Sequence, residues 1–188
     1  MKLLIAFLLV VAPLISQAQG LPPWIQKERN EALAKSRKIA KVLLAPSIVE
    51  SSKAPKGLMD TIMCGDEDDC GVDFVFSSPS GTLVINYMQG NYRLGMIPSS
   101  HPKVFACDKL AEAVANWANP NADLGKVTPR PTTLKELGAK ERLEGFVKLP
   151  KLRHGVKLYV ADNGDIPVAL AEEAGGCTVL YGFNVGGN

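Results

Sequence analysis

Apolar and polar residues alternate along three consecutive stretches in the middle of the chain. Such alternation is typical of strands that bury one face. Ser78-Pro-Ser-Gly81 and Gly90-Asn91 separate the stretches, and both contain residues that favour tight turns. The alternating apolar positions are Val72, Phe74 and Phe76, then Leu83, Ile85 and Tyr87, then Tyr92, Leu94 and Met96. This pattern predicts a three-stranded antiparallel meander with one apolar face.

A second set of strand-like stretches lies near the C-terminus. Residues 155–161 and 166–171 flank Asp162-Asn-Gly-Asp165, and Asn-Gly is typical of a tight hairpin turn. Pro167 lacks the N–H group of a sheet ladder, so its strand is expected at an edge or with a loosened start. Residues 177–185 complete the set, and we expect one shared face for Cys177, Val179, Tyr181, Phe183 and Val185. A second three-stranded antiparallel meander is therefore predicted.

The pattern before the first strand set is helical. Residues 24–44 contain neither Gly nor Pro, and small and apolar side chains recur there on one stripe at helical spacing. The opposite side carries lysines and arginines. We expect this helix to pack on its own domain; the alternative is a basic amphipathic helix that lies on an anionic membrane or caps a partner.

One or two further helices are expected between the strand sets. The first begins near Ser100 and runs through residues 103–119. The second is indicated by Thr133-Leu-Lys-Glu136, which fits a capping box. Prolines and serines predict a loop over residues 45–56, and prolines predict a linker over residues 120–131.

The N-terminus has the composition of a signal peptide. A basic start at Lys2 is followed by an apolar run and by Ser16-Gln-Ala18, whose small residues suit cleavage after Ala18. The alternative is a membrane anchor, but the run is shorter than the roughly 20 residues that cross a bilayer, and Pro13 interrupts it. We expect a periplasmic or secreted bacterial protein with no transmembrane segment after cleavage.

These elements predict a disulfide-stabilised α+β fold: an N-terminal helix, then two antiparallel three-stranded meanders with one or two helices between them. Residues 1–18 form the signal peptide, residues 19–45 the N-terminal amphipathic helix, and residues 46–188 a single α+β domain. The formal net charge is +2. A charge so close to zero argues against a dedicated nucleic-acid-binding protein, which needs a basic face to displace counterions.

Four cysteines in an exported chain indicate two disulfides, for which three connectivities exist. We favour Cys64 with Cys70, which closes a small loop, and Cys107 with Cys177, which closes a large one. The chain-entropy model assigns these loops about 2 and about 4 kcal/mol of stabilisation.

The segment between Cys64 and Cys70 is strongly acidic. With Asp73, five carboxylates fall within eight residues, so the group must face water, a cation or a basic partner. The spacing resembles a calcium loop only in part, because Cys70 and Ser77 stand where oxygen ligands are required. We expect no metal or cofactor, and a partner-binding surface formed by Asp66, Glu67, Asp68, Asp69 and Asp73. A solvated loop and a calcium site are the alternatives for this segment.

Few residues offer catalytic chemistry. Cys107 followed by His154 at the start of a strand resembles the cysteine amidases that cut cell-wall peptides, in which the cysteine lies at the N-terminus of a helix. Here a helix that begins near Ser100 would place Cys107 inside it instead. A structural Cys107 and a surface His154 are the plainer interpretation. Carboxylate pairs for glycoside cleavage could come from Asp162, Asp165, Glu172 and Glu173, but turn and surface positions explain these residues.

We therefore expect a binding protein of the inhibitor, immunity or accessory type, rather than an enzyme. Its acidic cysteine-bounded loop would contact a protein or cell-envelope partner with a basic surface. Two alternatives stay open: a cell-wall amidase or peptidase that uses Cys107 and His154, and a structural envelope-associated protein.

Overall fold

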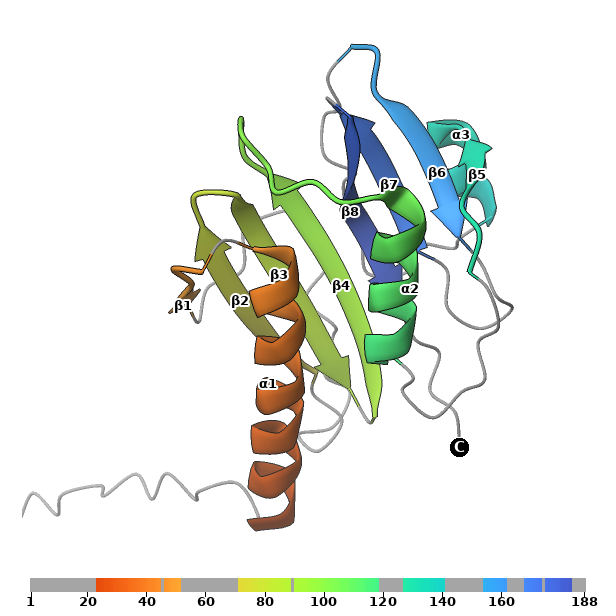
Figure 1. The fold of residues 1–188 in the computed structure, drawn as a ribbon. Coiled ribbons are helices and arrows are strands. Elements are labelled where there is room, and N and C mark those ends of the chain that lie inside the picture. The colour runs from red at the N-terminus through yellow and green to blue at the C-terminus, as the bar shows by residue number, and fades with distance from the viewer. Residues whose placement is uncertain are drawn as a thin grey trace, which may run out of the picture.

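In the part of the chain that it describes, the computed structural model contains one antiparallel sheet of eight strands, in the order β1-β2-β3-β4-β8-β7-β6-β5, with three helices packed on it (Figure 1). The structure describes residues 23–44, 46–51, 71–88, 90–118, 127–140, 154–161, 168–173 and 175–183. The elements are α1 (Pro23–Leu43), β1 (Val49–Ser51), β2 (Val72–Ser78), β3 (Gly81–Met88), β4 (Asn91–Pro98), α2 (Cys107–Ala118), β5 (Arg130–Thr132), α3 (Leu134–Lys140), β6 (Lys157–Ala161), β7 (Val168–Glu173) and β8 (Gly176–Phe183).

The two predicted strand sets belong to the same sheet. Strand β4 pairs with β8 through Arg93–Phe183, Leu94–Gly182 and Gly95–Tyr181, so the last strand of each set joins the two halves. The predicted α+β class, the N-terminal helix and the antiparallel strands are confirmed. The division into two separate three-stranded meanders is not, because β1 and β5 also extend the sheet at its two edges.

Both edge strands lie in segments that were predicted as loop and linker. Each has three residues, which is too short to show an alternating pattern. Strand β5 contains Pro131, a residue that sheets accept at their edges. The two edge strands form because β1 pairs with β2 and β5 pairs with β6. The residues of β1 or β5 alone therefore could not predict them.

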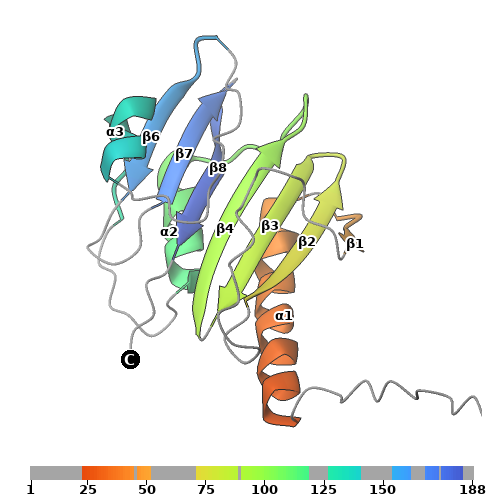
Figure 2. The same ribbon diagram turned by 180° about the vertical axis from the view of Figure 1, so that it is seen from behind.

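Helices α1 and α2 cover one face of the sheet, in front in Figure 1 and behind it in Figure 2. The apolar face of β2, β3 and β4 packs against them in the larger of two core clusters. Its buried members include Phe76, Leu83, Ile85, Tyr87, Tyr92, Leu94 and Met96, as the alternation predicts, with Val72 and Phe74 partly buried beside them. The apolar stripe of α1 is buried too, at Ile25, Ala32, Ser36, Ile39, Ala40 and Leu43.

A smaller core cluster joins α3 to residues of β6, β7 and β8. Leu137 of α3 is buried there with Leu180 and Tyr181, whereas Cys177 and Val179 belong to the larger cluster. The shared face predicted for Cys177 and Tyr181 is therefore wrong. Ala169 pairs with Tyr181 and Leu170 with Val179, so Leu180 is an extra residue, and such a bulge shifts the alternation by one position.

Polar contacts fasten α1 to α2 and to the sheet. The indole Nε1 of Trp117 donates to the carbonyl oxygen of Lys35 at 3.0 Å, and Lys35 Nζ donates to the carbonyl oxygen of Ala118 at 2.9 Å. The same ammonium group lies 4.2 Å from the ring centre of Tyr92. The hydroxyl of Tyr87 donates to the carboxylate of Glu28. No helix in the described part of the chain is both long and apolar enough to cross a membrane.

Helix α2 begins later than predicted. Its first residue is Cys107, and the backbone before it is extended, because Phe105 pairs with Cys177 of β8. The Phe105 N–H donates to the Cys177 carbonyl at 3.0 Å, and the Cys177 N–H donates to the Phe105 carbonyl at 2.7 Å. This long-range bridge prevents the helix from starting near Ser100.

Candidate functional site

The Cys107–Cys177 disulfide lies where α2 meets the sheet. The two Cα atoms are 5.0 Å apart, and the bond joins positions separated by 70 residues. Cys177 is fully buried in β8, while Cys107 at the start of α2 is half-buried. The predicted pairing of these two cysteines is confirmed. Cys64 and Cys70 lie outside the described residues, so their pairing stays a prediction.

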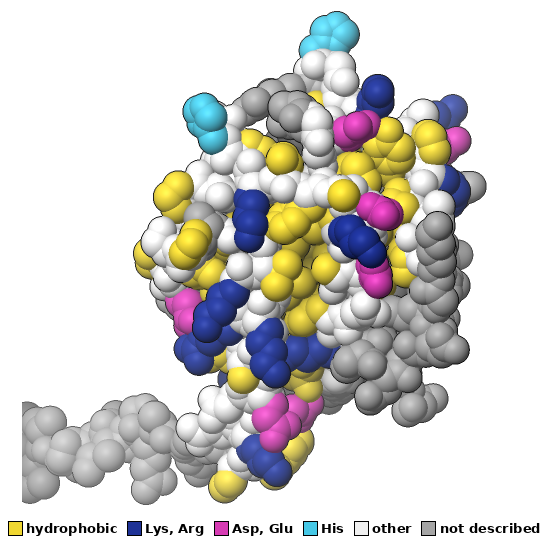
Figure 3. Space-filling model, in the orientation of Figure 1, with side chains coloured by type: hydrophobic (Ala, Val, Ile, Leu, Met, Phe, Trp, Pro, Cys, Tyr) yellow, Lys and Arg dark blue, Asp and Glu magenta, His cyan; other side chains and the backbone are white. Residues whose placement is uncertain are grey.

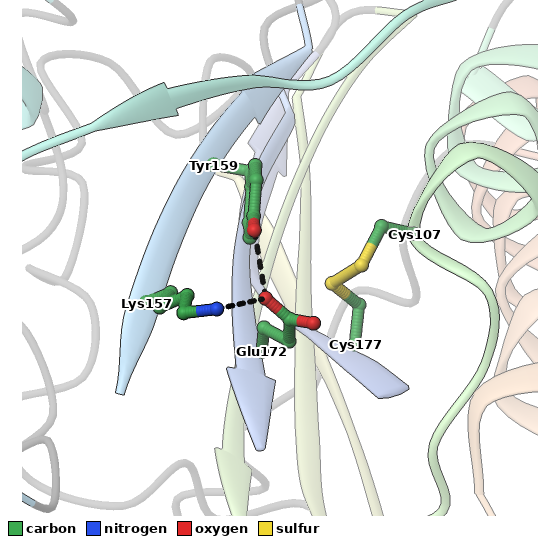
Figure 4. The surroundings of a disulfide bond; sticks show 5 residues. All are labelled: Cys107, Lys157, Tyr159, Glu172 and Cys177. Atoms are coloured by element: carbon green, nitrogen blue, oxygen red, sulfur yellow. Dashed lines mark hydrogen bonds and ion pairs between the residues drawn. A yellow bond between two sulfur atoms is a disulfide. The ribbon is translucent and has the colours of Figure 1, made fainter. Parts of the chain in front are cut away.

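A charged cluster flanks this disulfide on strands β6 and β7 (Figure 4). Glu172 pairs with Cys177 across the β7–β8 ladder. Its Oε2 accepts a hydrogen bond from the Tyr159 hydroxyl at 2.7 Å, and Lys157 Nζ lies 3.9 Å from the same oxygen. The hydrogen bond to Glu172 is the main reason that the pKa of Tyr159 is raised above its usual value.

The sequence did not reveal this cluster. Lys157 and Tyr159 are two positions apart, so the alternation of β6 places them on one face, but their partner on β7 depends on the strand register. In the sequence, Glu172 stands out only as one of four carboxylates that could serve glycoside cleavage. Of the other three, Asp162 and Asp165 lie outside the described residues. In the structure Glu172 is held by a phenol and an ammonium group, which suits a cross-strand structural contact.

His154 and Cys107, the residues of the alternative catalytic site, are not joined by any contact among the described residues. His154 is exposed in the turn before β6. The prediction that Cys107 lies inside a helix is wrong, because α2 starts at this residue. A cysteine at a helix N-terminus suits thiolate chemistry, yet this sulfur is bonded to Cys177. The amidase hypothesis therefore requires the bond to be open.

The acidic loop itself, with Asp66, Glu67, Asp68 and Asp69, lies outside the described residues. Asp73, the fifth carboxylate of the predicted binding surface, lies in β2. Its Oδ1 accepts a hydrogen bond from Asn86 Nδ2 on the neighbouring strand at 2.8 Å. This bond joins two residues that pair directly in the β2–β3 ladder, so it fixes the direction of the Asp73 side chain.

Asp73 also lines a hollow of about 300 Å³ between α1 and the β1–β2 edge. Leu33, Glu50, Ser51 and residues 74–76 form the rest of its wall. Arg37 binds Glu50 through two bonds, with Nε 2.5 Å from Oε1 and Nη2 2.9 Å from Oε2. These contacts lower the pKa of Glu50, chiefly through the hydrogen bond. The hollow thus combines an apolar wall with two fixed carboxylates.

Among the described residues, no group of three or more His, Cys, Asp or Glu side chains is placed to hold a metal ion. The acidic loop, for which calcium was the alternative, does not belong to those residues.

Comparison with known proteins finds no relative. No family model, no curated protein and no solved structure matches the chain. Any assignment of function therefore rests on its own residues.

Proposed function

We propose that the protein is an exported, disulfide-stabilised binding protein of the inhibitor, immunity or accessory type. Its acidic loop, residues 66–69, would act with Asp73 to contact a basic surface on a protein or cell-envelope partner. The observation that carries the proposal is the position of Asp73. This carboxylate is fixed by Asn86 and lines the hollow at the β1–β2 edge, and the chain enters β2 directly from the acidic segment.

Rigidity and charge both favour recognition at this edge. Strand β2 is paired with β3 along its whole length and with β1 over residues 75–77, so a partner that contacts Asp73 orders little additional chain. Four adjacent carboxylates repel one another in the free protein, and a basic surface would relieve that repulsion. Opposite charges also steer encounter between partners, an effect that salt weakens.

The test removes the negative charge from the loop. Wild-type protein and the variant D66N/E67Q/D68N/D69N would each capture partners from an envelope extract at low and at high salt. A captured protein would then be titrated with both forms. We expect a salt-sensitive partner whose affinity falls at least about ten-fold in the variant.

A matched variant, E31Q/D108N/E112Q/E136Q, removes the same number of charges from α1, α2 and α3. It should bind the partner as the wild type does, because these residues lie on the helices rather than at the β1–β2 edge. Equal affinity of the wild type and the loop variant would refute the role of the acidic loop. An equal loss of affinity in the loop variant and the helix variant would show a general effect of net charge instead.

A further inference from the structure

The outer side of α1 carries three exposed lysines, called here the basic stripe: Lys27 near the start of the helix, and Lys38 and Lys41 near its end. The opposite side of α1 is buried against the sheet, so residues half a turn away face outward. The residues that follow one another on this outward side are Lys27, Glu31, Ala34, Lys38 and Lys41, and all five are exposed. A helix of this length extends about 30 Å. Figure 3 shows dark blue side chains gathered over α1.

Little negative charge balances this basic stripe. Lys38 and Lys41 form no ion pair within the described ranges. Lys27 Nζ lies 4.0 Å from Glu31 Oε1. The two side chains are 78% and 70% exposed, so water screens this ion pair strongly. Arg37, on the flank, is neutralised by Glu50. The lysines that remain give the outward side of α1 a net positive charge.

The two ends of the helix extend this surface. Trp24, in the first turn, is 64% exposed. This end of α1 projects beyond the ends of strands β2, β3 and β4 in both ribbon views (Figures 1 and 2). At the other end, Lys103 Nζ donates to the carbonyl oxygen of Val42 at 2.6 Å, which brings a further cation to the helix C-terminus. An exposed indole and three exposed ammonium groups thus belong to the same helix.

We propose that the outward side of α1 binds an anionic membrane surface. The apolar stripe of α1 is already buried by the sheet, so the helix would lie on the headgroups rather than insert its apolar side. Lysines near an anionic leaflet each add to the attraction, and tryptophan favours the interface between headgroups and acyl chains. Three lysines spread along one helix side, with an exposed tryptophan in the first turn, fit an extended lipid surface better than a compact acidic protein.

Vesicle sedimentation of the processed, exported protein tests this proposal at low salt. We expect binding to phosphatidylcholine vesicles that contain phosphatidylglycerol, and none to pure phosphatidylcholine vesicles. The variant K27Q/K38Q/K41Q should lower the partition coefficient on the order of 100-fold. The fluorescence of Trp24 should shift to shorter wavelength on binding, and W24F, which retains only Trp117, should lose this shift.

The matched variant K109Q/K135Q/K157Q removes three lysines from other elements and should bind as the wild type does. Circular dichroism checks that each variant is folded. Equal binding to both kinds of vesicle, absence of binding to either, or equal losses in the two triple variants would each overturn the proposal. Binding of soluble poly-glutamate without binding of vesicles would assign the stripe to an acidic polypeptide and would also overturn it. None of these results depends on the acidic loop.

Discussion

Gly81 begins β3 with a φ of +145°, a backbone conformation that residues other than glycine rarely adopt. An added Cβ at this position would lie 2.5 Å from the carbonyl oxygen of Ile97 on β4. The turn before β3 therefore needs glycine both for its backbone angle and for the close approach of the next strand.

The substitution Gly81→Ala should lower the free energy of unfolding by about 2 kcal/mol or more. Gly90 is the matched position, because its φ is +85° but nothing lies within 4 Å of an added Cβ. Gly90→Ala should therefore cost only the backbone strain, about 1 kcal/mol. Urea unfolding measures the free energy of unfolding of both variants. An equal decrease in the two would contradict the close contact with Ile97.

At the residue scale, alternation predicted which side chains of the first strand set enter the core. Leu83, Ile85 and Leu94 are fully buried, as expected. The contact of Tyr159 with Glu172 was not predictable, because it depends on which strands become neighbours and in which register. Tyr181 was assigned to the wrong face because no local sequence feature marks the bulge at Leu180.

Helix α1 is attached to the sheet through a buried tyrosine as well as through its apolar stripe. Tyr87 is 8% exposed, and its hydroxyl donates to Glu28. Burial, and then the hydrogen bond to Glu28, raise the pKa of Tyr87 well above its usual value. The folded protein therefore holds this proton more tightly than the unfolded chain does.

This shift predicts a loss of stability at alkaline pH. The stability that the protonated Tyr87 hydroxyl contributes is fully present below about pH 10, the pKa of a tyrosine in an unfolded chain. This contribution decreases as the pH rises above that value. Tyr87→Phe should cost about 1 kcal/mol at neutral pH through loss of the hydrogen bond. Above a pH of about 10 its stability should fall less steeply than that of the wild type. The measurement is the free energy of unfolding of both proteins as a function of pH. An equally steep decrease in the two proteins above about pH 10 would contradict the role of Tyr87.

At the element scale, helix composition and capping patterns were reliable where the contacts are local. The capping box of α3 is present: the Thr133 N–H donates to Glu136 Oε2 at 3.0 Å, and the Glu136 N–H donates to Thr133 Oγ1 at 3.2 Å. The start of α2 was wrong because a distant strand, through the Phe105–Cys177 bridge, keeps the preceding backbone extended. The residues around the start of α2 do not indicate that contact.

At the scale of the whole molecule, the two strand sets meet along a short seam. Among the described residues, three pairs are in register between β4 and β8. The disulfide anchors the start of α2 to β8, and α2 also packs in the larger core cluster with residues of α1 and of β2, β3 and β4. For a closed loop of this size, the chain-entropy model gives about 4 kcal/mol of stabilisation. The bond therefore helps to hold both halves in one body.

The chemical state of Cys107 decides between a structural and a catalytic role for this cysteine. Peptide mapping by mass spectrometry of the native protein, alkylated without reduction, measures that state directly. A structural role predicts a peptide pair linked through Cys107 and Cys177 and no alkylation at Cys107. An unlinked Cys107 that reacts rapidly with the alkylating reagent would contradict this role, and would favour a cysteine-dependent hydrolase instead.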